Sequence, residues 1–186
     1  MTDSLIILGS TGSIGTQALE VCRHLGIRVP ALAAGHNIGL LESQVRQWRP
    51  ALVSVADAVG AADLKRRLAG FDAPVEITHG REGVLQAARH EGSGMVLAAM
   101  VGVAGLEPVM AAVAAGNDNS QGNKETLVSR GSLVMPLLKK NGRNLYPVDS
   151  EHSAIWQCLA GAPADGLKRI FLTASGGPFQ IGRAHV

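Results

Sequence analysis

The chain has 186 residues, 46% of them hydrophobic, which suffices for one domain with a buried core and the start of a second. With 17 basic against 15 acidic residues, no basic tract and only two Trp, one Tyr and three Phe, the composition argues against a nucleic-acid-binding protein. No apolar run reaches the ~18 residues of a membrane span and the polar MTDS leads directly into an apolar run, so we expect a cytoplasmic protein without a signal peptide or membrane contact.

Short apolar runs alternate with helical patterns along the chain. Strands are predicted near residues 4–8, 28–34, 51–55, 74–78, 95–99 and 144–148, and helices near residues 14–25, 38–48, 58–68, 81–89 and 106–115. Runs that are apolar throughout suit strands covered by helices on both faces. The order predicts an α/β protein with a doubly wound parallel sheet. A second unit follows, with a helix over residues 151–159 and a strand over residues 168–174.

The two cysteines lie far apart, in segments predicted to be helical. Neither Cys22 nor Cys158 belongs to a C-x-x-C motif or a cluster of Cys and His. We interpret both as reduced core residues, as is usual in a cytosolic protein.

A glycine-rich turn, LGSTGSIG, joins the first predicted strand to the first helix. Gly9, Gly12 and Gly15 form a G-x-x-G-x-x-G pattern. Glycines let the backbone approach a pyrophosphate, and a helix N-terminus offers free N–H groups to it. The alternative is a turn that needs glycine only for its backbone angles. At the first strand-to-helix turn of this α/β pattern, the motif favours a Rossmann-like dinucleotide site.

The end of the second predicted strand bears on which dinucleotide binds. An acid there would bind the ribose of NAD and repel a 2′-phosphate. The chain has instead Gly35, His36 and Asn37, of which the last two can donate hydrogen bonds to a phosphate. This favours NADP over NAD, although His36 could also be a solvated loop residue.

A polar triplet, Asn123, Lys124 and Glu125, opens a further predicted helix at the end of a strand. Ligands bind at this end of parallel sheets. Helix capping by Asn123 and a favourable helix-dipole interaction of Glu125 would explain two of the three residues without any ligand. Lys124 is disfavoured at a helix N-terminus unless it faces an anion.

The stretch PVDSEH places two carboxylates, Asp149 and Glu151, directly after the strand near residues 144–148. Two such groups can converge on Mg²⁺ or Mn²⁺, which usually takes only a few protein oxygens. Capping of the next helix is the alternative. A nucleophile formed by Ser150 and His152 is disfavoured, because the pair has neither a nucleophile elbow nor an oxyanion motif. The turn SGGPF, with Ser175, could hold a phosphate or simply reverse the chain.

Six motifs together, LGSTGSIG, AGHN, MVGVAGL, GNKETLV, PVDSEHSAIWQ and LTASGGPF, resemble 1-deoxy-D-xylulose 5-phosphate reductoisomerase between Leu5 and Phe179. The resemblance implies an N-terminal NADPH-binding domain followed by an α+β catalytic domain that binds a divalent metal, Mg²⁺ or Mn²⁺. It also implies conversion of 1-deoxy-D-xylulose 5-phosphate to 2-C-methyl-D-erythritol 4-phosphate in non-mevalonate isoprenoid biosynthesis. Alternatives are an NADP-binding module without catalysis and another NADP-dependent reductase of the same fold.

The resemblance also implies roles for individual residues. Asp149 and Glu151 would be metal ligands, and Lys124 and Glu151 would serve catalysis. Because the family often has a basic residue at the position of His36, we expect weaker binding of the 2′-phosphate near neutral pH. The implied cofactor contacts are Thr11, Gly12, Ser13, Ile14, Gly35, His36, Asn37, Asn123 and Glu125, and the implied substrate contacts are Lys124, Ser150, Glu151 and Ser175.

Two stretches depart from the family pattern. Residues 119–122, NSQG, are polar where the family has an apolar strand, so we expect either a disturbed strand or an error in the sequence. The last six residues, IGRAHV, correspond to one reading frame of a sequencing adapter, and we interpret residues 181–186 as a non-native tail. We therefore expect an NADPH-binding domain over residues 1–148, an incomplete catalytic domain over residues 149–180, no turnover, and loss of part of the family's homodimer interface.

Overall fold

The computed structural model describes residues 3–91, 93–100, 105–122, 124–163 and 165–171, with the backbone alone for residues 121 and 124–130. The chain divides into two compact units, Met1–Asp149 and Ser150–Val186. Each unit is described by itself. Within the described residues, no helix has both the length and the apolar character needed to span a membrane.

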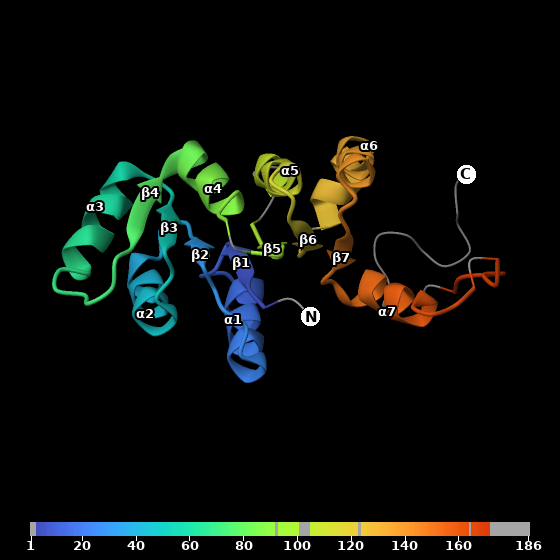
Figure 1. Ribbon diagram of the computed structural model, residues 1–186, viewed down its shortest axis with the longest axis horizontal. Coiled ribbons are helices and arrows are strands. Elements are labelled where there is room, and N and C mark those ends of the chain that lie inside the picture. The colour runs from blue at the N-terminus through green and yellow to red at the C-terminus, as the bar shows by residue number, and fades with distance from the viewer. Residues whose placement is uncertain (1–2, 92, 101–104, 123, 164, 172–186) are drawn as a thin grey trace, which may run out of the picture. The chain divides into compact units, whose positions relative to one another are not determined.

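The first unit is built on a seven-stranded sheet in which every neighbouring pair is parallel. The spatial order is β4-β3-β2-β1-β5-β6-β7, so the chain moves outward from β1 in one direction and from β5 in the other (Figure 1). This confirms the predicted doubly wound α/β sheet. The strands are β1 (Leu5–Leu8), β2 (Ala31–Ala33), β3 (Leu52–Val55), β4 (Glu76–His79), β5 (Met95–Ala98), β6 (Asp118–Gln121) and β7 (Leu145–Pro147).

Six helices connect these strands and cover both faces of the sheet. One core packs α1, α2 and α3 against side chains such as Ile7 of β1. The alternate residues of the same strand, Ile6 and Leu8, face α4 and α5. Figure 1 shows α1 and α2 on one side of the sheet and α4, α5 and α6 on the other. The helices are α1 (Ser13–Leu25), α2 (Ile38–Trp48), α3 (Ala58–Arg67), α4 (Gly80–Ala88), α5 (Leu106–Ala114) and α6 (Lys124–Asn141).

The polar strand β6 forms with its backbone pairing intact. Asn119 lies opposite Val96 of β5 and Leu145 of β7, and its N–H donates to the carbonyl of Asn144 at 2.9 Å. The expected disturbance of this strand is therefore wrong as far as the backbone is concerned, because ladder hydrogen bonds do not depend on side-chain polarity. The side chain of Asn119 is fully buried, and neither its Oδ1 nor its Nδ2 has a hydrogen-bond partner among the residues that the structure describes.

The second unit contains α7 (Ser150–Leu159), which buries none of its residues. Two predictions fail here. Cys158 is exposed, because this helix packs into no core, whereas Cys22 is buried as expected and its burial raises the pKa of its thiol. Residues 168–171 form no strand, since no second strand pairs with them in the part of this unit that the structure describes, and residues 172–174 of the predicted strand lie outside it.

Candidate cofactor-binding site

A cavity of about 620 Å³ opens at the carboxyl ends of the central strands. β1 and β5 are neighbours whose following helices lie on opposite faces of the sheet, and this switch in direction is where ligands bind in doubly wound folds. The wall is mostly apolar, as is usual for cofactor sites. It is lined by Gly9, Thr11, Gly12, Ala33, Ala34, Gly35, Ala56, Gly80, Arg81, Val84, Leu85, Ala99, Met100, Glu107 and Pro108.

The glycine loop after β1 holds the floor of this cavity in a shape that side chains would prevent. Gly9 has φ +94°, and a Cβ there would lie 2.6 Å from the carbonyl oxygen of Ala99. A Cβ on Gly15 would lie 2.2 Å from the carbonyl oxygen of Gly9. The predicted glycine motif thus keeps the loop against both β5 and the first turn of α1.

The N-terminus of α1 faces the loop without a side-chain cap. Gly12 is its N-cap residue, and the first turn contains no acid. The N–H groups of Ser13, Ile14 and Gly15 therefore lack the intrahelical partners that later residues have, and the helix dipole favours an anion in front of them. Of the four predicted phosphate contacts, Thr11 and Gly12 line the cavity, whereas the side chain of Ile14 packs against the core and leaves only its N–H for a ligand.

A buried pair of side chains fixes the loop to α2. Ser10 Oγ donates to Gln44 Oε1 at 2.7 Å, and Gln44 Nε2 donates to the carbonyl oxygen of Ser10 at 2.8 Å. Ser10 is fully buried and Gln44 is 5% exposed. The two hydrogen bonds satisfy both side chains and hold the backbone that enters the anion site.

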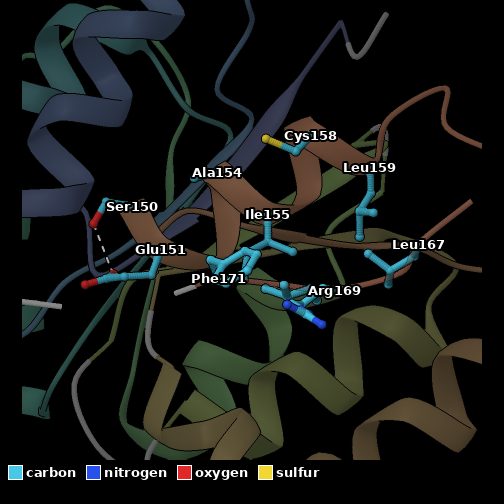
Figure 2. Close-up of a pocket in the computed structure, with 10 residues that line it drawn as sticks. Ser150, Glu151, Ala154, Ile155, Cys158, Leu159, Leu167, Arg169 and Phe171 are labelled. Carbon is cyan, nitrogen blue, oxygen red and sulfur yellow. Dashed lines mark hydrogen bonds between the residues drawn. The ribbon is translucent and has the colours of Figure 1, made fainter. Parts of the chain in front are cut away.

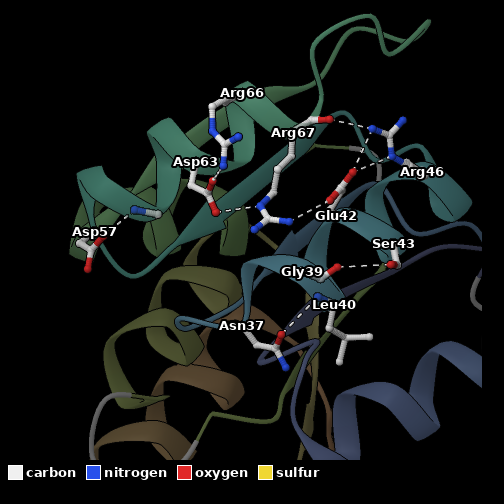
Figure 3. Close-up of polar contacts among 11 residues, drawn as sticks. Asn37, Gly39, Leu40, Glu42, Ser43, Arg46, Asp57, Asp63, Arg66 and Arg67 are labelled. Carbon is white, nitrogen blue, oxygen red and sulfur yellow. Dashed lines mark hydrogen bonds and ion pairs between the residues drawn. The ribbon is translucent and has the colours of Figure 1, made fainter.

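The predicted adenosine contacts follow β2. Gly35 lines the cavity, and the exposed side chain of Asn37 accepts a hydrogen bond from the Leu40 N–H at 3.2 Å, which caps α2 (Figure 3). His36 is exposed, with Nδ1 3.6 Å from Oδ2 of Asp57. Asp57 follows β3 and caps α3 by accepting from the Gly60 N–H at 2.8 Å. The structure therefore brings an acid to the end of β2 that the local sequence there lacks.

The charged residues of the cavity wall neutralise each other. Arg81, at the start of α4, donates from Nε to Glu107 of α5 at 2.7 Å and makes a second hydrogen bond to the same carboxylate. It also pairs with Glu82 at 2.5 Å. Hydrogen bonding lowers the pKa of the Glu107 carboxyl and raises the pKa of Arg81. Because this guanidinium is already paired, backbone N–H groups are the better candidates for holding a pyrophosphate.

The polar triplet falls at the limit of the described structure. Lys124 begins α6, as predicted, and Glu125 lies in its first turn, but the side chains of both lie outside the described residues. Asn123 and Ser175 lie outside them altogether. Their roles remain predictions.

The two predicted metal ligands fall on either side of the boundary between the units. Asp149 is the last residue of the first unit, and Glu151 lies in the first turn of α7, where its Oε2 accepts from Ser150 Oγ at 3.0 Å (Figure 2). Within the second unit Ser150 and Glu151 line a cavity of about 500 Å³ whose other walls are mainly apolar. The described residues contain no group of three or more His, Cys, Asp or Glu side chains placed to hold a metal ion.

Three polar residues at the cavity or its loop were missed by sequence reasoning. Gln44 interrupts the apolar face of α2 next to Val45 and Leu41, which could have marked it as a buried hydrogen-bonding residue. Asp57 lies two residues after the end of a parallel strand and could have been found by the same rule that singled out His36. No sequence signal pointed to Arg81, since its pairing depends on how α4 and α5 pack.

Comparison with known proteins identifies the same fold and family. A family model for 1-deoxy-D-xylulose 5-phosphate reductoisomerase matches residues 5–131, and one for the C-terminal domain of that enzyme matches residues 145–185. The 1-deoxy-D-xylulose 5-phosphate reductoisomerase of Symbiobacterium thermophilum is 54% identical over 185 residues, which is 97% of this chain and 48% of that protein. The chain thus spans about half the length of the curated relatives it matches.

Solved structures agree with these matches. The enzyme of Zymomonas mobilis in complex with NADPH has 37% sequence identity and a TM-score of 0.78, covering 85% of this chain and 41% of that one. A DOX-P reductoisomerase in complex with NADPH, fosmidomycin and magnesium has 36% identity and a TM-score of 0.80, covering 87% of this chain and 39% of that one. The fold, the glycine loop and both family matches show that this chain belongs to the 1-deoxy-D-xylulose 5-phosphate reductoisomerase family.

Proposed function

We propose that the first unit binds NADPH in the cavity at the carboxyl ends of β1 and β5. The observation that carries this proposal is the uncapped N-terminus of α1, which directs free N–H groups toward a loop that lines the cavity. The pyrophosphate would lie at Thr11, Gly12, Ser13 and Ile14, and the adenosine at Gly35, His36 and Asn37. A relative solved with NADPH, which shares the fold at 37% identity, supports this assignment.

For the whole protein we propose the reaction after which the family is named, the NADPH-dependent rearrangement and reduction of 1-deoxy-D-xylulose 5-phosphate to 2-C-methyl-D-erythritol 4-phosphate. A relative solved with magnesium supports a divalent cation at Asp149 and Glu151, whose carboxylate oxygens are the donors that Mg²⁺ and Mn²⁺ prefer. When bound, such a cation supplies Lewis-acid polarisation of a carbonyl group.

The other motifs that resemble the family would complete this site from the chain's own residues. Asn123 and Glu125 would approach the cofactor at the start of α6, and Lys124 would offset negative charge on the substrate. Ser150 would hydrogen-bond the substrate, consistent with its position beside the Glu151 carboxylate. Ser175 would bind the substrate phosphate. For the 186 residues by themselves we propose cofactor binding without turnover, so NADPH oxidation by this chain with the substrate and Mg²⁺ would refute that part.

The decisive experiment is a fluorescence titration of the purified chain with NADPH and, separately, NADH. We expect saturable binding that prefers NADPH. Gly12→Asp is the sharpest variant, because Asp is a good N-cap residue and so preserves the helix while its charge repels a pyrophosphate. Gly12→Asn is the matched control, since it has the same shape without the charge. Equal binding by these two variants would contradict the proposed pyrophosphate position.

The oligomeric state and the cellular location are properties of the full-length protein. We propose that it is a homodimer, as its family resemblance implies, and that it works in the bacterial cytoplasm on water-soluble sugar phosphates. The source of the relative from Symbiobacterium thermophilum, a bacterium, supports the second statement. Sedimentation of the full-length protein tests the first.

A further inference from the structure

An acid that follows a different strand lies next to the proposed adenosine end of the cavity. Ala56, which follows β3, lines the cavity beside Gly35, which follows β2. The next residues in each segment, Asp57 and His36, bring a carboxylate and an imidazole within 3.6 Å of each other. Both side chains are open to solvent, at 50% and 82% exposure, and so are accessible to a ligand.

Asp57 is held in this place by a second contact. Its Oδ1 accepts from the Gly60 N–H at 2.8 Å as the cap of α3 (Figure 3). Its Oδ2 is the atom that faces His36. The carboxylate therefore stays next to the imidazole without depending on a flexible side chain. α3 itself is tied to α2 through Arg67, which pairs with Asp63 at 2.8 Å and with Glu42 at 3.4 Å.

This arrangement limits what His36 can offer to a phosphate. When the imidazole is protonated, the Asp57 carboxylate balances its charge. A 2′-phosphate dianion that binds there then contacts a His36–Asp57 pair with no net charge. When the imidazole is neutral, the phosphate faces the carboxylate alone. Both states reduce the attraction that separates NADPH from NADH, because the carboxylate lies within one Debye length of any phosphate that contacts His36.

We propose that Asp57 determines cofactor specificity, its carboxylate weakening the binding of the 2′-phosphate at His36 and so reducing the preference for NADPH over NADH. This inference rests on the proposed binding of NADPH in the cavity. It assigns to the end of β3 the role that an acid at the end of β2 has in NAD-binding sheets.

Asp57→Asn tests the proposal because it removes the charge and keeps an oxygen that can cap α3. We expect this variant to bind NADPH about threefold to tenfold more tightly than the wild type, with NADH binding changed less than about twofold. Added salt should reduce the gain. Asp72→Asn is the matched control: Asp72 is 73% exposed and pairs with Arg49 at 3.0 Å, and neither residue lines the cavity. Thermal unfolding checks that both variants are folded.

The outcomes separate the two proposals. If the wild type binds NADPH and Asp57→Asn has the same ratio of NADPH affinity to NADH affinity as the wild type, the specificity role of Asp57 is overturned. The proposed cofactor site is then still supported. Weaker NADPH binding by that variant would also overturn the specificity role, since the carboxylate would then assist His36. A wild-type chain that is folded and binds neither nucleotide would overturn the cofactor site and, with it, this inference.

Discussion

Strands β1 and β6 occupy similar places in the sheet, but β1 is apolar and β6 is polar. Each pairs in parallel with a neighbour on both sides. β1 reads LIIL, and the polar residue just after it, Ser10, is paired with Gln44. β6 reads DNSQ, and the buried side chain of its Asn119 makes no hydrogen bond to any described residue. A parallel ladder of backbone hydrogen bonds therefore accommodates polar side chains, and the energetic penalty comes from a buried polar side chain that remains unpaired.

The largest effect is expected from a substitution in the loop between β1 and α1. Gly15→Ala places a Cβ 2.2 Å from the carbonyl oxygen of Gly9, so the loop must move. We expect a loss of at least about 3 kcal/mol in unfolding free energy and the loss of NADPH binding. Denaturant unfolding and the fluorescence titration measure the two effects.

Gly39→Ala is the control for that substitution. Gly39 also lies in the first turn of a helix, α2, and a Cβ there meets nothing within 4 Å. We expect no loss of stability and a gain of up to about 1 kcal/mol from helix propensity. If Gly15→Ala were tolerated as well as Gly39→Ala, close approach of the backbone would not be the reason for the glycine.

The second prediction makes β1 resemble β6 by removing the partner of Ser10. Gln44→Leu preserves the apolar packing of α2 and leaves the buried hydroxyl and carbonyl of Ser10 without their hydrogen bonds. We expect a loss of about 2–3 kcal/mol in unfolding free energy and weaker NADPH binding, because the loop is no longer fixed. In the double variant Ser10→Ala/Gln44→Leu, the loss should be smaller than the sum of the two single losses. Strict additivity would mean that the pair contributes nothing as a pair.

The third prediction makes β6 resemble β1. Asn119→Leu replaces an unpaired buried amide by an apolar side chain of similar size between Val96 and Leu145. We expect a gain of about 1–2 kcal/mol in unfolding free energy, which corresponds to a rise of about 2–8 °C in Tm. Asn119→Asp, which buries a charge in the same volume, should lower Tm instead. A Tm that falls in both variants would show that the amide has a favourable role.

Much of the fold follows from the sequence, because strands covered on both faces leave uninterrupted apolar runs. The helix over residues 38–48 was predicted with the bounds that the structure gives. β6 carried no such run, and only its pairing with β5 and β7 makes it a strand. Residues 168–174 include such an apolar run, but no strand pairs with residues 168–171 in the described part of their unit, so the same rule failed in the opposite direction. In both places tertiary pairing, which local sequence does not encode, decided the outcome.

The candidate site likewise has a part that the sequence predicts and a part that it does not. The glycine loop could be predicted because its chemistry lies within seven consecutive residues. Asp57 and Gln44 act through residues about 20 to 35 positions away in the chain, His36 and Ser10, which meet only in the folded sheet. A pattern search along the chain therefore finds the anion-binding loop and misses the groups that fix it and set the charge beside it.

The exposed pair Arg81–Glu107 serves to test whether the Ser10–Gln44 pair stabilises the fold because it is buried. We expect the exposed pair to contribute less to stability. The hydrogen bond to Arg81 lowers the pKa of Glu107, so its carboxyl stays ionised to lower pH in the folded chain than in the unfolded one. The pair therefore stabilises the fold above the ordinary carboxyl pKa of 4.5, and this contribution disappears as pH falls through the lowered folded value. Glu107→Gln should lower Tm slightly near neutral pH and converge with the wild type in acid. Because solvent screens the pair, the change should be smaller than that of Gln44→Leu.

The control is Glu20→Gln, on the exposed face of α1, where the carboxylate makes no ion pair with any residue that the structure describes. It should leave Tm unchanged across the same pH range, so the difference between the two variants isolates the contact with Arg81. A Glu107→Gln loss as large as that of Gln44→Leu would mean that a solvent-exposed bridge between α4 and α5 stabilises this sheet as much as a buried pair does, and the contrast between β1 and β6 would then depend on pairing alone and not on burial.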